Sequence, residues 1–134
     1  MKYVETCNIL LGSVRTFDEL LGRSLSRIVS SDTELLLYLT ENNYVRFCHH
    51  QDCCEDVYIE DITGDLDDLV GSPLLVAEEV TDYTGPDTED ESYTWTFYRF
   101  ATRKGSVTVR WYGSSNGYYS ESVDVEVVDM NMGE

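Results

Sequence analysis

The strongest structural signal in the chain is its C-terminal stretch YTWTFYRFATRKGSVTVRWYGSSNGYYSESVDVEVV, residues 93–128. Apolar residues occupy every second position from Val107 to Trp111, and again from Val123 to Val127. Such alternation is typical of strands that bury one face and expose the other. The turns RKGS and GSSNG between the apolar runs have sequences that favour hairpins. The stretch therefore predicts a three-stranded antiparallel meander over residues 93–101, 106–112 and 118–128.

The region before this meander is also rich in short strand patterns. TFDELLG, residues 16–22, carries a capping box and a terminal glycine, which predict a short helix. A second helical turn is predicted over residues 65–71, with Gly71 at its end. We expect an α+β protein that is mostly β, built as a single domain over residues 1–134. An acidic mobile loop at about 82–92 and a frayed tail at about 129–134 complete the prediction. Further strands are predicted over residues 25–30, 34–40, 44–50, 57–62 and 73–80.

The charge of the chain is extreme for 134 residues, with a formal net charge of -17. Residues 47–98 contain no Lys or Arg, although 15 of the acidic residues lie there. An acidic surface repels the phosphates of nucleic acids and attracts basic protein grooves or cations. The alternative is a charged surface that only favours solubility. The carboxylates predicted to bind a partner are Asp65, Asp67, Asp68, Glu78, Glu79, Asp87, Glu89, Asp90 and Glu91.

The segment CHHQDCCED, residues 48–56, gathers side chains that commonly bind zinc. The predicted ligands are His49, His50, Cys53 and Cys54, and a further ligand could come from Cys48, Asp52, Glu55 or the distant Cys7. The alternative interpretation has buried thiols beside two histidines that cap a strand. A reactive cysteine is disfavoured because the neighbouring carboxylates oppose formation of a thiolate. The expected cofactor is therefore Zn²⁺ or none, and no catalytic residue is predicted.

The aromatic hairpin offers a second candidate ligand site. Its residues are Arg110, Trp111, Tyr112, Tyr118 and Tyr119, which could stack on a small molecule such as a signalling nucleotide. The alternative is that these rings form cross-strand pairs that stabilise a hairpin.

Several motifs together resemble a known but uncharacterised family. They are QDCCE at residues 51–55, IEDI at 59–62, GDLDDL at 64–69 and RWYGSSNGYYSE at 110–121. The chain is similar in these motifs to a small domain family found largely in tailed phages and prophages, over roughly residues 49–126. The histidine that matches the family pattern is His49, whereas an acidic residue often stands at the position of His50. The resemblance implies a phage origin and no established activity.

These observations lead to one functional hypothesis and one alternative. We expect a phage-encoded acidic protein that inhibits a host defence factor, most concretely an anti-CRISPR-like DNA mimic that competes with nucleic acid for a Cas nuclease. The alternative is a sponge or sensor for a signalling nucleotide. The protein is expected to be a binding protein and not an enzyme, without direct contact to nucleic acid or membrane. The N-terminus lacks an apolar run long enough for a signal peptide, so the expected location is the host cytoplasm.

Overall fold

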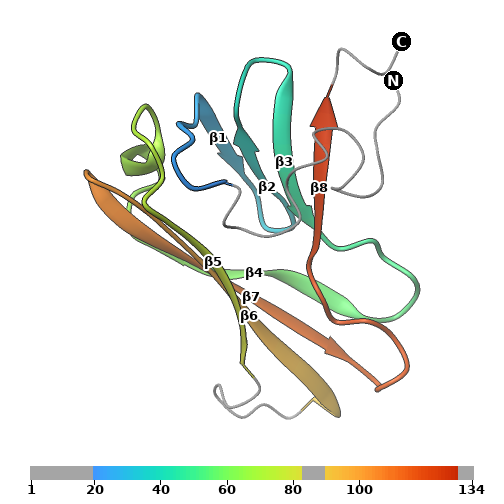
Figure 1. Ribbon diagram of the computed structural model, residues 1–134. Coiled ribbons are helices and arrows are strands. Elements are labelled where there is room, and N and C mark those ends of the chain that lie inside the picture. Colours follow the sequence, from blue (N-terminus) through green and yellow to red (C-terminus); the bar gives the residue numbers. More distant parts are fainter. Residues whose placement is uncertain (1–19, 83–89, 130–134) are drawn as a thin grey trace.

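The computed structural model describes residues 20–82 and 90–129, and it is built from two four-stranded antiparallel sheets. The first sheet has the strand order β1-β2-β3-β8, and the second has the order β4-β7-β6-β5. Strands of the two sheets cross steeply in Figure 1, with the first sheet above the second. The strands are β1 (Arg27–Ser30), β2 (Leu35–Tyr38), β3 (Asn43–Cys48), β4 (Asp56–Thr63), β5 (Val76–Asp82), β6 (Ser92–Thr102), β7 (Gly105–Ser115) and β8 (Asp124–Asp129).

The alternating residues of the central strands form the core between the sheets. Phe47 on β3 meets Tyr98 and Phe100 on β6 at ring centroid distances of 4.8 and 6.1 Å. Burial of these apolar faces is the main favourable contribution to folding. The prediction of a mostly β protein is confirmed. The buried cluster contains Leu20, Leu25, Leu35, Leu37, Val45, Phe47, Val57, Leu69, Leu74, Ala77, Tyr98, Phe100, Val107, Val109, Trp111 and Val127.

The predicted C-terminal meander is corrected by the sheet topology. β6 and β7 pair along their full length, from Ser92 with Ser115 to Thr102 with Gly105. The third strand, β8, does not join them, because β7 already pairs with β4 along its other edge. Instead, β8 pairs with β3 of the first sheet. To join a sheet, a strand must pair with a neighbouring strand whose edge has unpaired backbone groups. For β8 this edge belongs to β3 in the other sheet.

The two predicted helices have different outcomes. Most of the first, over residues 16–22, lies outside the described residues. The second is a single 3-10 turn, η2 (Leu66–Leu69), whose N-cap Asp65 accepts a hydrogen bond from the Asp67 backbone N–H at 3.0 Å. The four residues of η2 form a single turn, in which Leu69 is buried in the core. No helix in the described part of the chain is long and apolar enough to cross a membrane.

The predicted acidic loop and tail fall largely on residues that the structure does not describe. β5 continues to Asp82 and β6 begins at Ser92, so the structure bounds the segment between them. Residues 83–89 lie outside the description. Of the predicted tail, Asp129 ends β8 and the following residues lie outside the description.

Candidate functional site

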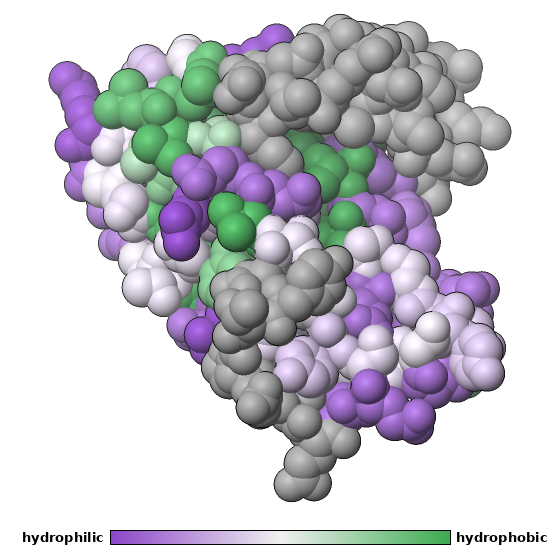
Figure 2. Space-filling view, turned by 60° about the horizontal axis from the view of Figure 1, so that its bottom comes forward, coloured by the Kyte–Doolittle hydropathy of each residue, from purple (hydrophilic) through white to green (hydrophobic). Residues whose placement is uncertain are grey.

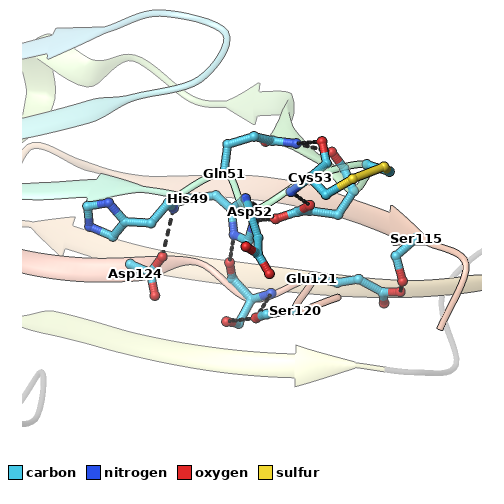
Figure 3. A network of polar contacts seen from close by, with 12 residues as sticks. His49, Gln51, Asp52, Cys53, Ser115, Ser120, Glu121 and Asp124 are labelled. Atoms are coloured by element: carbon cyan, nitrogen blue, oxygen red, sulfur yellow. Dashed lines mark hydrogen bonds and ion pairs between the residues drawn. A yellow bond between two sulfur atoms is a disulfide. The ribbon is translucent and has the colours of Figure 1, made fainter. Parts of the chain in front are cut away.

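The connection between β3 and β4 folds around a buried carboxylate, that of Glu55. Its side chain is fully buried and accepts hydrogen bonds from the backbone N–H groups of Asp52 (2.8 Å) and Cys53 (2.9 Å). His49 Nε2 lies 2.6 Å from Glu55 Oε2, and His49 Nδ1 lies 2.7 Å from the carbonyl oxygen of Ser122. The His49 ring therefore ties the Glu55 carboxylate to the β7–β8 connection. The loop and the β7–β8 connection lie together in Figure 3.

This arrangement stabilises the charged form of Glu55. The His49 hydrogen bond, together with the backbone N–H donors, lowers the pKa of the Glu55 carboxyl from 4.5 to about 2, although burial acts in the opposite direction. A carboxyl whose pKa is lower in the folded state contributes stability that is complete above its unfolded pKa. That contribution is lost as the pH falls through the folded pKa.

We therefore expect Glu55→Gln to flatten the acid side of the stability profile. The wild-type protein should lose stability as the pH falls from 4.5 towards 2, and the variant should show less of this loss. The variant should also be less stable at neutral pH, because Gln lacks the carboxylate that binds His49 and the two backbone N–H groups. Urea unfolding at a series of pH values measures both effects. Asp52→Asn is the matched control, since only its backbone N–H binds Glu55, and equal slopes for both variants would contradict the assignment.

A second polar group lies on the other side of β3, where Cys48, His50 and Glu126 come together. One candidate ligand atom of each lies within 4.8 Å of the other two, so the group can hold a metal ion. His50 Nε2 is 2.7 Å from Glu126 Oε2, and Cys48 Sγ is 3.8 Å from Glu126 Oε1. Glu126 and Cys48 are buried, whereas His50 is exposed.

The electrostatics of this group depend on its burial and on Arg46. Burial raises the pKa of the Cys48 thiol to about 11, with Arg46 acting against this shift and Glu126 adding to it. In the absence of a cation the thiol is therefore protonated at neutral pH. Arg46 bridges two carboxylates, with Nε 2.7 Å from Glu34 and an Nη 3.4 Å from Glu126.

The residues predicted as zinc ligands do not converge on one point. Cys53 and Cys54 are joined to each other by a disulfide, which corrects their prediction as zinc ligands. The chain bends at these two residues, and both are exposed. His49 is engaged by Glu55, and only His50 belongs to the group that can hold a metal. In this state the two sulfur atoms of the disulfide are not thiolate ligands.

The carboxylates predicted to bind a partner are also spread over the molecule. Asp68 lies beside the C-terminal end of β6, since its carbonyl oxygen accepts a hydrogen bond from Thr102 Oγ1. Asp90 and Glu91 precede the start of β6, at the opposite end of the strand. The 11 residues of β6 span about 30 Å. Asp65 and Asp67 belong to the same turn as Asp68, and Asp87 and Glu89 lie outside the described residues.

The two remaining predicted carboxylates lie on an edge strand and point to opposite faces. Glu78 is 4.0 Å from Arg99 on the outer face of the second sheet. Glu79 accepts a hydrogen bond from the Tyr98 hydroxyl at 2.6 Å on the core side. The seven predicted carboxylates that the structure describes therefore do not form one continuous patch.

The aromatic hairpin is divided by the same alternation of faces. Trp111 is 1% exposed in the core, whereas Arg110 and Tyr112 point to the outer face of the second sheet. There Tyr112 packs on Trp95 at 4.6 Å and its hydroxyl donates to Asp90. Tyr118 is 86% exposed and lies in the β7–β8 connection. Tyr119 lies in that connection too and lines a separate polar cleft with Glu121, so the five residues share no common site.

Three other carboxylates do share a surface feature, which sequence reasoning missed as a set. Asp32, Glu60 and Asp61 line a shallow hollow of about 370 Å³ between the β1–β2 turn and β4. The backbone N–H of Ile59 donates to the carbonyl oxygen of Asp32 at 2.7 Å and joins the two sheets at this point. We call this feature the acidic hollow. Its carboxylates come from the β1–β2 turn and from β4, 28 positions apart, and no local spacing marks them as neighbours.

Comparison with known proteins gives a family and no further relative. A family model described as "Domain of unknown function (DUF7448)" matches residues 18–125. No curated protein and no solved structure matches the chain.

Proposed function

Since the chain belongs to the family of domains of unknown function DUF7448, which supplies no activity, we propose its function from its surface chemistry. The protein is an acidic binding protein that occupies a basic groove on a protein partner and excludes nucleic acid from it. Competition of this kind needs carboxylates that stay at the surface, and it needs no catalytic group.

The observation that carries this proposal is that three of the described basic side chains are bound to groups of the protein itself. Arg110 lies 2.6 Å from Glu60, and Arg46 binds Glu34 and Glu126. Lys104 Nζ donates to the carbonyl oxygen of Val70 at 2.6 Å. These cations neutralise or cap groups of their own chain, so they add little to the field outside the molecule.

The surface itself is suited to a charged contact. In the face drawn in Figure 2, hydrophilic residues spread over several parts of the described surface, and hydrophobic residues lie mainly at its upper left and near its centre. The acidic hollow adds a concave feature in which Asp32 and Asp61 are exposed. A concave feature lined by one sign of charge focuses its field and favours basic side chains of a partner.

The proposed setting is a tailed phage or prophage, with the protein acting in the cytoplasm of the host. The proposed partner is a defence nuclease of the Cas type, whose positively charged channels hold its guide and target strands. The protein then acts as an anti-CRISPR inhibitor by imitating the charge of nucleic acid. The resemblance in QDCCE, IEDI and GDLDDL supports the setting, and the net charge of -17 supports the mode of binding.

A zinc ion belongs to this proposal as a structural component. It would strengthen the end of β3, because the residues that can hold it lie on β3, on β8 and just after β3. A domain of this size does not need a metal to fold, so the ion adds stability to an existing core.

The proposal predicts that binding weakens as salt rises. Exposed charge pairs are screened over about 8–10 Å at physiological ionic strength, so affinity should fall steadily between low and high salt. The tagged protein should recover a nucleic-acid-binding partner from host cells, and it should compete with a DNA duplex for that partner in a mobility-shift assay. Recovery of only apolar partners, or an affinity that salt does not change, would contradict the proposal.

A further inference from the structure

We propose that Cys48, His50 and Glu126 form a binding site for a zinc-like transition-metal ion that links β3 to β8. The site goes beyond the proposed function, because it does not depend on the acidic hollow or on the identity of a partner. It also differs from the set predicted from sequence, of which it keeps only His50.

The sheet itself brings the three ligands together. β3 and β8 are antiparallel neighbours in which Arg46 faces Glu126 and Cys48 faces Asp124. Alternation along the strands places Cys48 and Glu126 on the side opposite the core, and side chains on one face of adjacent strands meet. His50 follows Cys48 by two positions, and its backbone N–H donates to Asp124 Oδ2 at 2.9 Å. Backbone pairing therefore fixes the origins of all three side chains.

The distances suit a tetrahedral ion after a small movement of one ring. Zinc bonds of about 2.0–2.3 Å to nitrogen, oxygen and sulfur place neighbouring ligand atoms about 3.3–3.6 Å apart. Cys48 Sγ and Glu126 Oε1 are 3.8 Å apart, close to this spacing. The His50 ring, now 2.7 Å from Glu126 Oε2, must move outward by less than about 1 Å. The His50 side chain is 48% exposed, so solvent leaves room for this movement.

The local charge favours a divalent cation. Glu126 is 1% exposed, and a buried carboxylate is costly unless it is paired. Its guanidinium partner, Arg46, is shared, since it lies closer to Glu34 (2.7 Å) than to Glu126 (3.4 Å). With Asp124 beside His50, the cluster holds three carboxylates and one guanidinium. An ion at this place offsets the excess negative charge, and Asp124 or water can complete its coordination.

The donor set identifies the class of metal. One thiolate, one imidazole and one carboxylate suit zinc or cobalt better than magnesium or calcium, which prefer oxygen ligands alone. The ligating form of Cys48 is the thiolate, whose proton leaves to solvent when the ion binds.

The test uses Co²⁺ as a spectroscopic probe on the full chain after treatment with a chelator. Bound Co²⁺ should give the sulfur-to-cobalt charge-transfer band that reports a thiolate ligand, and Zn²⁺ should displace it. Native mass spectrometry should find one ion per chain. Absence of the band together with absence of bound metal would overturn the proposal.

Amino-acid substitutions test which side chains bind the ion, and they distinguish this site from the set of zinc ligands predicted from the sequence. Cys48→Ser should remove the band, and His50→Ala should weaken Co²⁺ binding at least tenfold. Because the His50 ring also pairs with the buried carboxylate of Glu126, His50→Ala should lower the melting temperature of the metal-free protein, and the Co²⁺ titration is made at a temperature at which this variant is folded. The matched control, Cys53→Ser with Cys54→Ser, should keep the band. A band that survives in Cys48→Ser, or that disappears in the control, would overturn the assignment of these ligands.

Discussion

Replacing Phe47 with alanine is expected to lower the free energy of unfolding by about 3–5 kcal/mol. Phe47 is 0% exposed and is the aromatic contact between the sheets, reaching from β3 to Tyr98 and Phe100 on β6. Its loss removes a large apolar side chain and leaves a cavity that neighbouring strands fill only in part. Domains of this kind have total stabilities of about 5–15 kcal/mol, so the variant should be close to unfolding. Chemical denaturation followed by tryptophan fluorescence measures the change.

The control for Phe47→Ala is an equally drastic truncation at the surface. Tyr118 is 86% exposed, and Tyr118→Ala should change the unfolding free energy by no more than about 0.5 kcal/mol. Similar stabilities for the two variants would mean that the two sheets do not pack through Phe47. The comparison therefore tests the central feature of the fold.

The sequence predicts each strand better than it predicts which strands are neighbours. Alternation of apolar residues is local, and it correctly indicated β6 and β7 and the hairpin between them. The partner of β8 depends on which strand edges remain free once β4 has paired with β7, and that is a property of the whole sheet. The helical turn predicted over residues 65–71 is also present in part, since Asp65 is the N-cap of the η2 turn.

The candidate site shows the same limit. The density of Cys and His in residues 48–56 indicated a segment that supplies two of the three clustered side chains, Cys48 and His50. Glu126 stands 76 positions after His50 in a strand whose outer face was predicted to be solvated, so no spacing connects it to the segment. Glu55 was likewise considered only as a ligand, although its carboxylate organises the loop through backbone N–H groups. Such hydrogen bonds depend on the fold of the loop and leave no residue-type signal.

Reversing the charge of the acidic hollow should cause the largest loss of function among surface variants. We expect Asp32→Lys with Asp61→Lys to weaken partner binding by roughly 10- to 100-fold, about 1.4–2.8 kcal/mol. Each exposed charge pair contributes about 0.2–1 kcal/mol, and lysine replaces attraction by repulsion at both positions. Both residues are exposed, so the melting temperature should stay near that of the parent. Titration of the recovered partner at several salt concentrations measures the loss, and the remaining affinity should depend less on salt.

The matched control for this double variant changes the net charge by the same amount elsewhere. Glu41 lies in the β2–β3 turn and Asp56 begins β4, and both are exposed and do not line the acidic hollow. Because salt screens exposed charges beyond short range, Glu41→Lys with Asp56→Lys should retain most of the affinity. Equal losses in both double variants would show that only the net charge attracts the partner. A loss confined to the Glu41 and Asp56 variant would place the contact near those two residues, and the acidic hollow would then have no part in binding.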